Sequence, residues 1–271
     1  MTLTEGLENS DLTLLGLIIM AGMMLAREAG YRLGRWRARH REKPDDGLSV
    51  LVGSLLGLMS FVLAINLSTS ITRFEDRRHA TLNEVTAIST AWLQGRAVAE
   101  SEGQQIARLL ERYLAERRAF ADAPQGSPEV AAAAAATSIL QAAIWTEVTA
   151  LLRARTDPQT VGLSAALTTT FDNTTAQVLA IETGLPRRLV WLLVIASALA
   201  ISALGLYLGV LGHPRLVLSL VIVTVWSGIM VLILDVSTAR IGRLNTDLRL
   251  YDWTAESFAA FPPILAAPGP R

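Results

Sequence analysis

Hydrophobic positions gather into four long apolar segments, at residues 12–26, 47–72, 189–212 and 216–234, with a more polar region between the second and third. About 20 apolar residues cross the hydrocarbon core of a bilayer. The first segment reaches that length through Gly30 and Tyr31 if the Arg27 side chain extends along the helix to the head groups. The pattern therefore predicts an all-α integral membrane protein with four transmembrane helices.

The second apolar segment carries no charged residue and then continues into the charged run 73–78 without a helix breaker. No proline occurs between Leu48 and Leu93, and the first glycine after the apolar run is Gly95. We therefore predict one helix from Leu48 to about residue 93, half of it outside the membrane. At 1.5 Å per residue such a helix would be roughly 65–70 Å long.

The region between the second and third spans is predicted to be helical throughout. Ile106, Leu109, Leu110 and Tyr113 recur at helical spacing and define one apolar face. An alanine-rich helix is expected over 129–155, and another from Pro158 to about residue 183. On the helix at 129–155, we expect six apolar residues to face a partner: Ile139, Leu140, Ile144, Trp145, Val148 and Leu151.

These segments define the predicted domain organisation. It comprises a first transmembrane helix (1–31), a basic loop (32–46), a second transmembrane helix (47–72, continuing to about 93), a helical extramembrane domain (73–186), a third transmembrane helix (187–212), a fourth (216–235) and a C-terminal tail (236–271). The short link at 213–215 predicts that the last two spans form an antiparallel hairpin. Prolines 262, 263, 268 and 270 predict disorder from Ser257 onward.

Composition excludes several kinds of chemistry. The 271 residues carry zero net charge and no cysteine, which rules out disulfides, thiolate metal ligands and cysteine nucleophiles. The three histidines lie in separate segments, and no phosphate-binding glycine loop or nucleophile elbow is present. Acidic and basic residues balance one another, so no nucleic-acid surface is indicated. We expect neither an enzyme nor a cofactor or metal site, and an N-terminus without a basic region predicts no cleaved signal peptide.

The sequence leaves orientation open in what we take to be a multi-pass protein of the cell (inner) membrane. The positive-inside tendency places the basic loop in the cytoplasm and the helical domain on the other side. This loop contains Arg32, Arg35, Arg37, Arg39, Arg41 and Lys43. Arginines also flank the spans at the opposite end: Arg73, Arg77, Arg78, Arg187, Arg188, Arg240 and Arg243. The density of basic residues along the chain favours a cytoplasmic first loop, whereas the total number of basic residues on each side does not.

Small residues recur at spacing four in two spans, as Gly53 and Gly57 in the second and as Gly205 and Gly209 in the third. Ala196 and Ala200 extend the third-span pattern. Such pairs let helix backbones approach closely in lipid. The pattern is explained either by packing within one subunit or by an interface between subunits of a homo-oligomer.

The second span also carries a candidate pore stripe. Leu58, Phe61 and Ile65 share one apolar face and are followed by the hydroxyl residues Ser68, Thr69 and Thr72, with Asn66 beside them. A polar amide in a span usually faces protein or water. Large apolar groups flanked by hydroxyls suit a narrow pore that closes by dewetting. Taken alone, such a stripe more often faces lipid or the protein core than a pore.

Charged residues continue on this helix beyond the membrane, where Arg73, Arg77 and Glu84 lie close to one face. Arg77 and Glu84 are candidates to pair with the helix that carries Glu111, Tyr113 and Arg117, and so to fix the junction between membrane and domain. The alternative is a set of solvated charges, where a pair at spacing four contributes about 0.3 kcal/mol.

The segments 73–78 and 82–93, the Leu-Glu-Arg-Tyr run at 110–113 and the Leu-Ile-Leu-Asp run at 232–235 resemble the bestrophin-like domain family of bacterial membrane proteins. More distantly, 60–65 followed by Thr72, Arg73 and Phe74 is similar to the pore helix of bestrophins, which are pentameric anion channels. That similarity implies a hydrophobic neck at Phe61 and Ile65, with Gly57 in place of a bulky outermost residue. The acidic calcium clasp of animal bestrophins is absent, and the family's cytosolic helical domain conflicts with the orientation that the arginine-rich loop favours.

Two functional hypotheses follow from these observations. The first is a bestrophin-like homo-oligomer, a pentamer, whose second helix lines a path for small anions such as chloride. In it Phe61 and Ile65 form a gate, and hydroxyls replace part of the ion's hydration. The alternative is a non-conducting scaffold or sensor, anchored in the lipid bilayer, whose helical domain binds a partner.

Overall fold

The computed structural model describes residues 3–40, 47–98, 101–124, 126–183, 186–237 and 248–261, with side chains from Thr13 onward except that of Arg187. Within these ranges the chain forms α-helices joined by short turns and contains no strand. The described residues divide into two compact units. Helix α2 (Leu48–Ala97) runs unbroken and contributes residues to both, since the first unit extends to Phe74 and the second begins at Glu75. The predicted continuous helix is thus confirmed and ends slightly later than expected.

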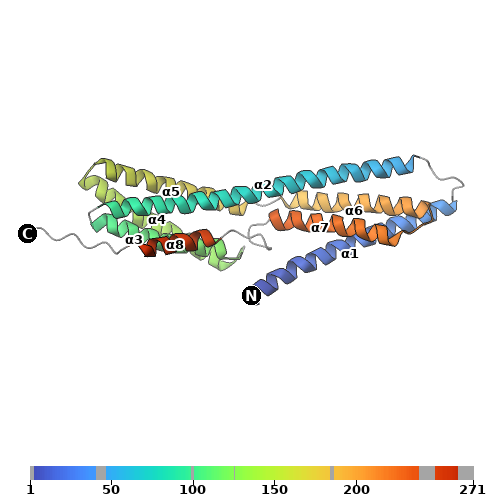
Figure 1. Cartoon of the computed structure of the whole chain (residues 1–271), viewed down its shortest axis with the longest axis horizontal. Helices are drawn as coiled ribbons and strands as arrows, with labels where there is room; N and C mark the ends of the chain where they lie inside the picture. Colours follow the sequence, from blue (N-terminus) through green and yellow to red (C-terminus); the bar gives the residue numbers. More distant parts are fainter. Residues whose placement is uncertain are drawn as a thin grey trace, which may run out of the picture. The chain divides into compact units, whose positions relative to one another are not determined.

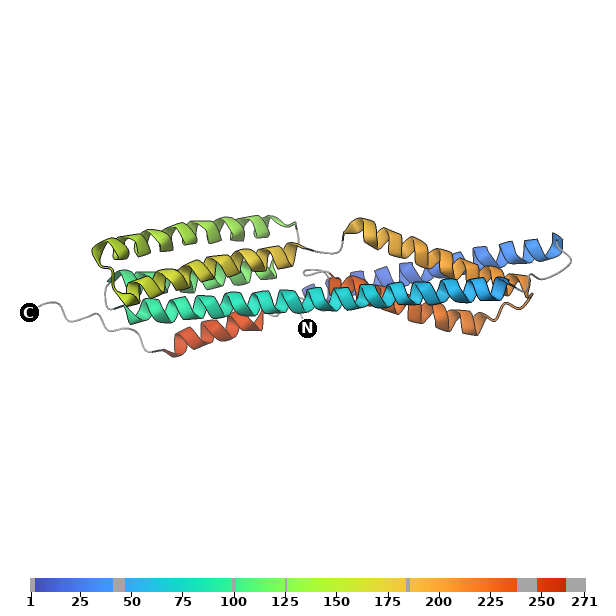
Figure 2. The same ribbon diagram turned by 90° about the horizontal axis from the view of Figure 1, so that it is seen from above.

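The first unit contains α1 (Leu3–His40), the first half of α2, α6 (Arg187–Val210) and α7 (Leu216–Ser237). Figure 2 shows α6 and α7 as a helical pair alongside that half of α2. The core of this unit is apolar and draws on all four helices, with Met23, Leu63, Ile201, Val223 and Ile233 almost completely buried. The predicted hairpin of the last two spans is confirmed, with its turn at residues 211–215.

Five of the described helices are long and apolar enough to cross a membrane: α1, α2, α4, α6 and α7. The protein is therefore a multi-pass membrane protein. The helix that the sequence did not assign to the membrane is α4 (Pro128–Ala154), which belongs to the second unit and owes its hydropathy largely to alanine. The four-span arrangement stays a prediction.

Helix α1 corrects two expectations. It continues to His40, so residues 32–40 of the expected basic loop are helical, and 41–46 lie outside the described residues. Arg27 does not extend toward solvent, because its side chain is 1% exposed. Its guanidinium donates to Ser219 Oγ at 3.3 Å and to the Pro214 carbonyl, and it pairs with Glu28 at 3.1 Å. Arg27 thereby joins α1 to the start of α7.

The small-residue spacing of the third span is used inside the subunit. A side-chain carbon added at Gly205 would collide with the Arg27 carbonyl oxygen, and one at Gly209 with that of Tyr31. On the facing helix, Gly30 and Gly34 lie against the backbone of α6 in the same way. For Gly205 and Gly209 the interpretation as packing within one subunit is therefore correct. The helix that they pack against is α1, which was not predicted from the sequence.

The second unit contains the rest of α2, α3 (Ser101–Asp122), α4, α5 (Pro158–Glu182) and α8 (Arg249–Ala260). Figure 1 shows α3, α4, α5 and α8 around this half of α2. The predicted apolar face of α3 is confirmed, since Ile106, Leu109, Leu110 and Tyr113 are all buried. On α4 the prediction holds only in part, because Ile139 is 70% and Trp145 is 42% exposed.

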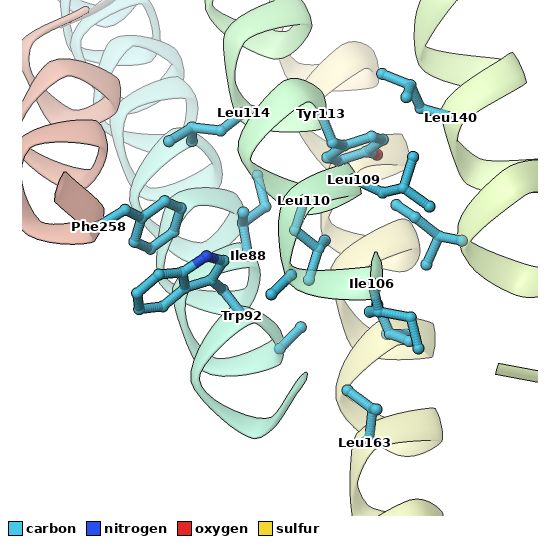
Figure 3. Close-up of a cluster of buried hydrophobic side chains, with 14 of the residues drawn as sticks. Ile88, Trp92, Ile106, Leu109, Leu110, Tyr113, Leu114, Leu140, Leu163 and Phe258 are labelled. Atoms are coloured by element: carbon cyan, nitrogen blue, oxygen red, sulfur yellow. The ribbon is translucent and has the colours of Figure 1, made fainter. Parts of the chain in front are cut away.

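Helix α8 overturns the expectation that the chain is disordered from Ser257 onward. The helix extends to Ala260, and both Tyr251 and Phe258 are buried in the core of the second unit. Phe258 stacks on Trp92 of α2, with ring centroids 4.2 Å apart, as Figure 3 shows. The proline-rich residues 262–271 lie outside the described residues. The prediction of disorder is therefore wrong for residues 257–261, which belong to α8 or follow it directly.

Candidate pore-lining face of α2

In the first unit, α2 turns one face toward the core and leaves the opposite face uncovered. Met59 and Leu63 pack into the core, whereas Leu58 is 59%, Phe61 63% and Ile65 49% exposed. The spacings between these three exposed residues keep them on one side of the helix. The predicted stripe of Leu58, Phe61 and Ile65 is therefore a continuous apolar surface of the protomer.

The same face begins with glycines that nothing covers. A side-chain carbon added at Gly53 or at Gly57 would have no atom within 4 Å. This contrasts with Gly205 and Gly209, which are tightly packed against α1. The two Gly-xxx-Gly pairs thus differ in use, and only the pair on α2 leaves room for another helix or for lipid.

Beyond the apolar stripe, the hydroxyl residues Ser68, Thr69 and Thr72 are all exposed. Thr69 donates to the Ile65 carbonyl at 3.0 Å, and Thr72 to the Ser68 carbonyl at 3.2 Å. A threonine hydroxyl bound to the backbone in this way offers only its oxygen lone pairs to a ligand. The Ser68 hydroxyl makes no hydrogen bond within the part of the chain that the structure describes. Ser68 is therefore the hydroxyl best able to donate to an anion.

Asn66, the intramembrane amide, is half-buried beside this face. Its Nδ2 donates to the Val62 carbonyl at 2.8 Å, one helical turn earlier. That bond satisfies one amide proton inside the helix and leaves the second available. The position agrees with the expectation that the amide avoids full exposure to lipid.

In the second unit, residues of α2 and α5 line an open polar groove that was not predicted from the sequence. The groove has a volume of about 440 Å³, and Asn83, Thr86, Thr90, Thr169 and Asn173 are among its lining residues. No charged residue lines it. The recurrence of Asn83, Thr86 and Thr90 at spacings of three and four was the available signal, but the contribution of α5 requires the tertiary fold.

Glu84, near the start of the second unit, belongs to a buried network of polar side chains. Arg117 Nε lies 2.6 Å from Glu84 Oε1, and both side chains are at most 1% exposed. The expected pairing of Glu84 with α3 is confirmed, and the interpretation of Glu84 as a solvated charge is wrong. Arg77 is also buried, and Arg73 is half-buried. That these residues fix the junction between membrane and domain stays a prediction.

Two further residues complete the network and were missed from the sequence. The Tyr251 hydroxyl donates to Glu84 Oε2 at 2.6 Å, and Arg117 Nη2 donates to Gln177 Oε1 at 2.5 Å. Burial, followed by the neighbouring Glu84 carboxylate, raises the pKa of Tyr251 well above its ordinary value of 10.0. Tyr251 therefore stays neutral and acts as a donor, so that Glu84 is satisfied from α3 and α8 together.

Comparison with known proteins identifies the fold. No protein-family model matches the chain, and neither does any curated protein. A variant of the bacterial bestrophin homologue from Klebsiella pneumoniae superposes with a TM-score of 0.69 at 13% identity, covering 92% of this chain and 98% of that one. The fold is bestrophin-like. A second structure of the Klebsiella homologue gives 0.67 at 14% identity, covering 90% and 96%, and a membrane-protein variant gives 0.66 at 14%, covering 91% and 97%.

The bestrophin-like fold confirms what the resemblance in the α2 segment implied about architecture. Identities of 13–14% carry no residue-level role from those proteins to this chain. The candidate site therefore depends on the exposed face of α2 itself. Among the described residues, no group of three or more histidine, aspartate or glutamate side chains is placed to hold a metal ion.

Proposed function

We propose that this protein is a homo-oligomeric, anion-permeable channel of the inner membrane, whose axis is lined by the exposed face of α2. The observation that carries the proposal is the uncovered surface formed by Gly57, Phe61, Ile65 and Ser68. A helix on the outside of a bundle has to bury an apolar face in lipid or against other helices. The bestrophin-like fold supports burial of this face against other helices, with five copies of the subunit arranged around an axis.

In this arrangement Phe61 and Ile65 form the narrow apolar part of the path, and small anions such as chloride pass them with part of their hydration removed. Rings of large apolar side chains gate pores by excluding water. Gly57 contributes no bulk, so the constriction is confined to about one helical turn, between Phe61 and Ile65. Ser68 then supplies hydroxyl protons to the anion directly beyond it, where partial dehydration is most costly.

The alternative is a scaffold or sensor that conducts nothing and presents the same α2 face to lipid. The bonds of Thr69 and Thr72 to the backbone favour it, because hydroxyls satisfied inside their own helix tolerate lipid. In that case the helical unit would bind a partner protein and the spans would serve as anchors.

Chloride efflux from liposomes that hold the purified full chain separates the two functions. The channel requires efflux above empty vesicles and a further increase in Phe61→Ala, which removes the largest group of the constriction. Ile195→Ala is the matched control, since Ile195 is an apolar residue of α6 that is 55% exposed. Efflux equal to that of empty vesicles for both the wild type and Phe61→Ala would overturn the proposal and favour the scaffold.

A further inference from the structure

The last turns of α1 form an exposed basic surface at one end of the first unit. The stretch from Arg32 to His40 contains four arginines and no acidic residue, and the α6–α7 turn adds Arg215. Arg32, Arg35, Arg39 and Arg215 are exposed. We call Arg35, Arg39 and Arg215 the basic collar. Its charge is not balanced locally by any carboxylate within these two segments.

The length of α1 places this surface at the level of the lipid head groups. The apolar part of α1 begins after Asp11, and the helix runs to His40. The 19 residues from Thr13 to Tyr31 cover roughly 28 Å, close to the thickness of the hydrocarbon core. The next nine residues extend about 13 Å farther, through the head-group layer.

Packing fixes which sides of α1 face outward here. Gly34 is buried against the backbone of α6 at Leu206, which holds the opposite sides of the helix away from the protein. Arg32, Arg35 and Arg39, at spacings of three and four, follow one exposed side. Leu33 and Trp36, which are 52% and 60% exposed, follow the adjacent side. Tryptophan beside arginine is the composition typical of a membrane–water interface.

The collar joins two segments that are far apart in sequence. The Arg35 guanidinium reaches the α6–α7 turn, where its Nη1 would lie 3.3 Å from a side-chain carbon added at Gly212. Gly212 adopts a φ of +76°, which favours glycine, and the exposed Arg215 follows three residues later. Arg35 is therefore held beside the turn that carries Arg215.

The exposed arginines at this end of α1 and in the α6–α7 turn differ in how far the described residues compensate their charge. Arg32 pairs with Glu28 at 3.0 Å and is already partly compensated. Arg35, Arg39 and Arg215, in contrast, form no ion pair within the part of the chain that the structure describes. A planar guanidinium binds a phosphate group through two parallel hydrogen bonds.

We propose that the basic collar is a binding site for the head groups of anionic phospholipids, with Leu33 and Trp36 against the upper acyl chains. Anionic lipids are favoured over zwitterionic ones because the latter bring a cation that the collar repels. Each arginine near an anionic surface raises the binding affinity for that surface roughly fivefold at low salt. The site is independent of whether α2 conducts ions.

Native mass spectrometry of the purified full chain, with equal amounts of dioleoyl phosphatidylglycerol and dioleoyl phosphatidylcholine, tests this assignment. Wild-type protein is expected to retain phosphatidylglycerol preferentially, and Arg35→Gln/Arg39→Gln to lose about tenfold or more of that preference. Arg112→Gln/Arg153→Gln removes the same charge from exposed positions of α3 and α4 and should leave the preference unchanged. Equal retention of both lipids by the wild type, or equal losses in the two double variants, would overturn the proposal.

Two further measurements show whether the phosphate group at the collar belongs to a lipid or to a soluble anion. Rising sodium chloride should reduce the preference for phosphatidylglycerol, because the contacts are electrostatic and exposed. Millimolar glycerol 3-phosphate should not displace the lipid, since it lacks the chains that contact Leu33 and Trp36. Displacement by glycerol 3-phosphate would assign the collar to soluble anions and overturn the lipid assignment.

Discussion

Glu84 of α2 and Arg117 of α3 form an ion pair of 2.6 Å that solvent does not reach. The Tyr251 hydroxyl from α8 donates to Glu84, and the Gln177 amide oxygen from α5 accepts from Arg117. Four helices of the second unit therefore meet at one buried pair of charges. Such a pair is stable only if both charges are present and hydrogen-bonded.

Removing one charge should destabilise the second unit strongly. We expect Arg117→Met to lower the free energy of unfolding by about 3–5 kcal/mol, because Glu84 is then a buried charge without its partner. The double variant Glu84→Gln/Arg117→Met should recover most of that loss, since no charge is left buried. Denaturant unfolding followed by circular dichroism measures both. A double variant that is no more stable than Arg117→Met would contradict this account of the pair.

Tyr251 should make the protein sensitive to alkaline pH. Its pKa is raised in the folded state, so the unfolded chain loses this proton first as the pH rises. Stability from this residue is fully present below about pH 10 and falls as the pH rises further. Tyr251→Phe should reduce that alkaline loss and should lower stability near neutral pH by about 1–2 kcal/mol through the lost hydrogen bond. Tyr207→Phe, a half-buried tyrosine of α6, is the control and should leave stability near neutral pH unchanged.

Phe258 should hold α8 on the second unit. Phe258→Ala removes a buried ring that stacks on Trp92, and we expect a loss of about 3 kcal/mol. Faster hydrogen exchange confined to α8 would show that the helix has detached. Trp253→Ala removes an aromatic ring from the same helix that is 58% exposed, and it should leave exchange unchanged. Equal protection of α8 in Phe258→Ala and wild type would contradict this role for the stack.

The two glycine pairs should respond differently to alanine. Gly205→Ala forces a methyl group against the Arg27 carbonyl, and we expect it to lower thermal stability in detergent by the equivalent of about 1–3 kcal/mol. Gly57→Ala meets no atom within 4 Å and should not lower the stability of the subunit. A destabilised Gly57→Ala variant of the isolated subunit would show that this face is covered within the protomer.

Among the three hydroxyl residues that follow the apolar stripe, Ser68 should matter most for anion permeation. Of Ser68, Thr69 and Thr72, only Ser68 has a hydroxyl proton without a backbone partner, so we expect Ser68→Ala to lower chloride flux about threefold to tenfold, which corresponds to one hydrogen bond. Thr69→Ala and Thr72→Ala are matched controls with smaller expected effects. The same loss in all three variants would mean that donation by Ser68 has no special role.

Local patterns in the sequence predicted much of this architecture. The unbroken α2, the α6–α7 hairpin and the apolar face of α3 follow from helical spacing and from the absence of breakers. The burial of Arg27 did not follow, because its partners at Pro214 and Ser219 are almost 200 residues away. Helix α8 was missed because it is short, and its stability comes from Trp92 and Glu84 on another helix.

The candidate site was predicted in outline only. Spacing alone placed Leu58, Phe61 and Ile65 on one face, and the structure confirms that they share an exposed side of α2. The use of Gly205 against Arg27 and the openness around Gly57 depend on which helix lies opposite, which no local pattern records. The division of donors between Ser68 and its threonine neighbours likewise depends on side-chain rotamers.

The central claim is that water and anions reach Phe61 along an axis formed by several copies of α2. Because the chain contains no cysteine, Phe61→Cys creates a single reactive thiol without further changes. Chloride efflux from liposomes holding this variant is measured before and after a negatively charged, membrane-impermeant methanethiosulfonate reagent is added. The account predicts rapid modification and loss of most of the flux, with Ile195→Cys unaffected. Efflux that is unchanged although the thiol at position 61 has been modified, or a thiol that stays unmodified, would contradict it.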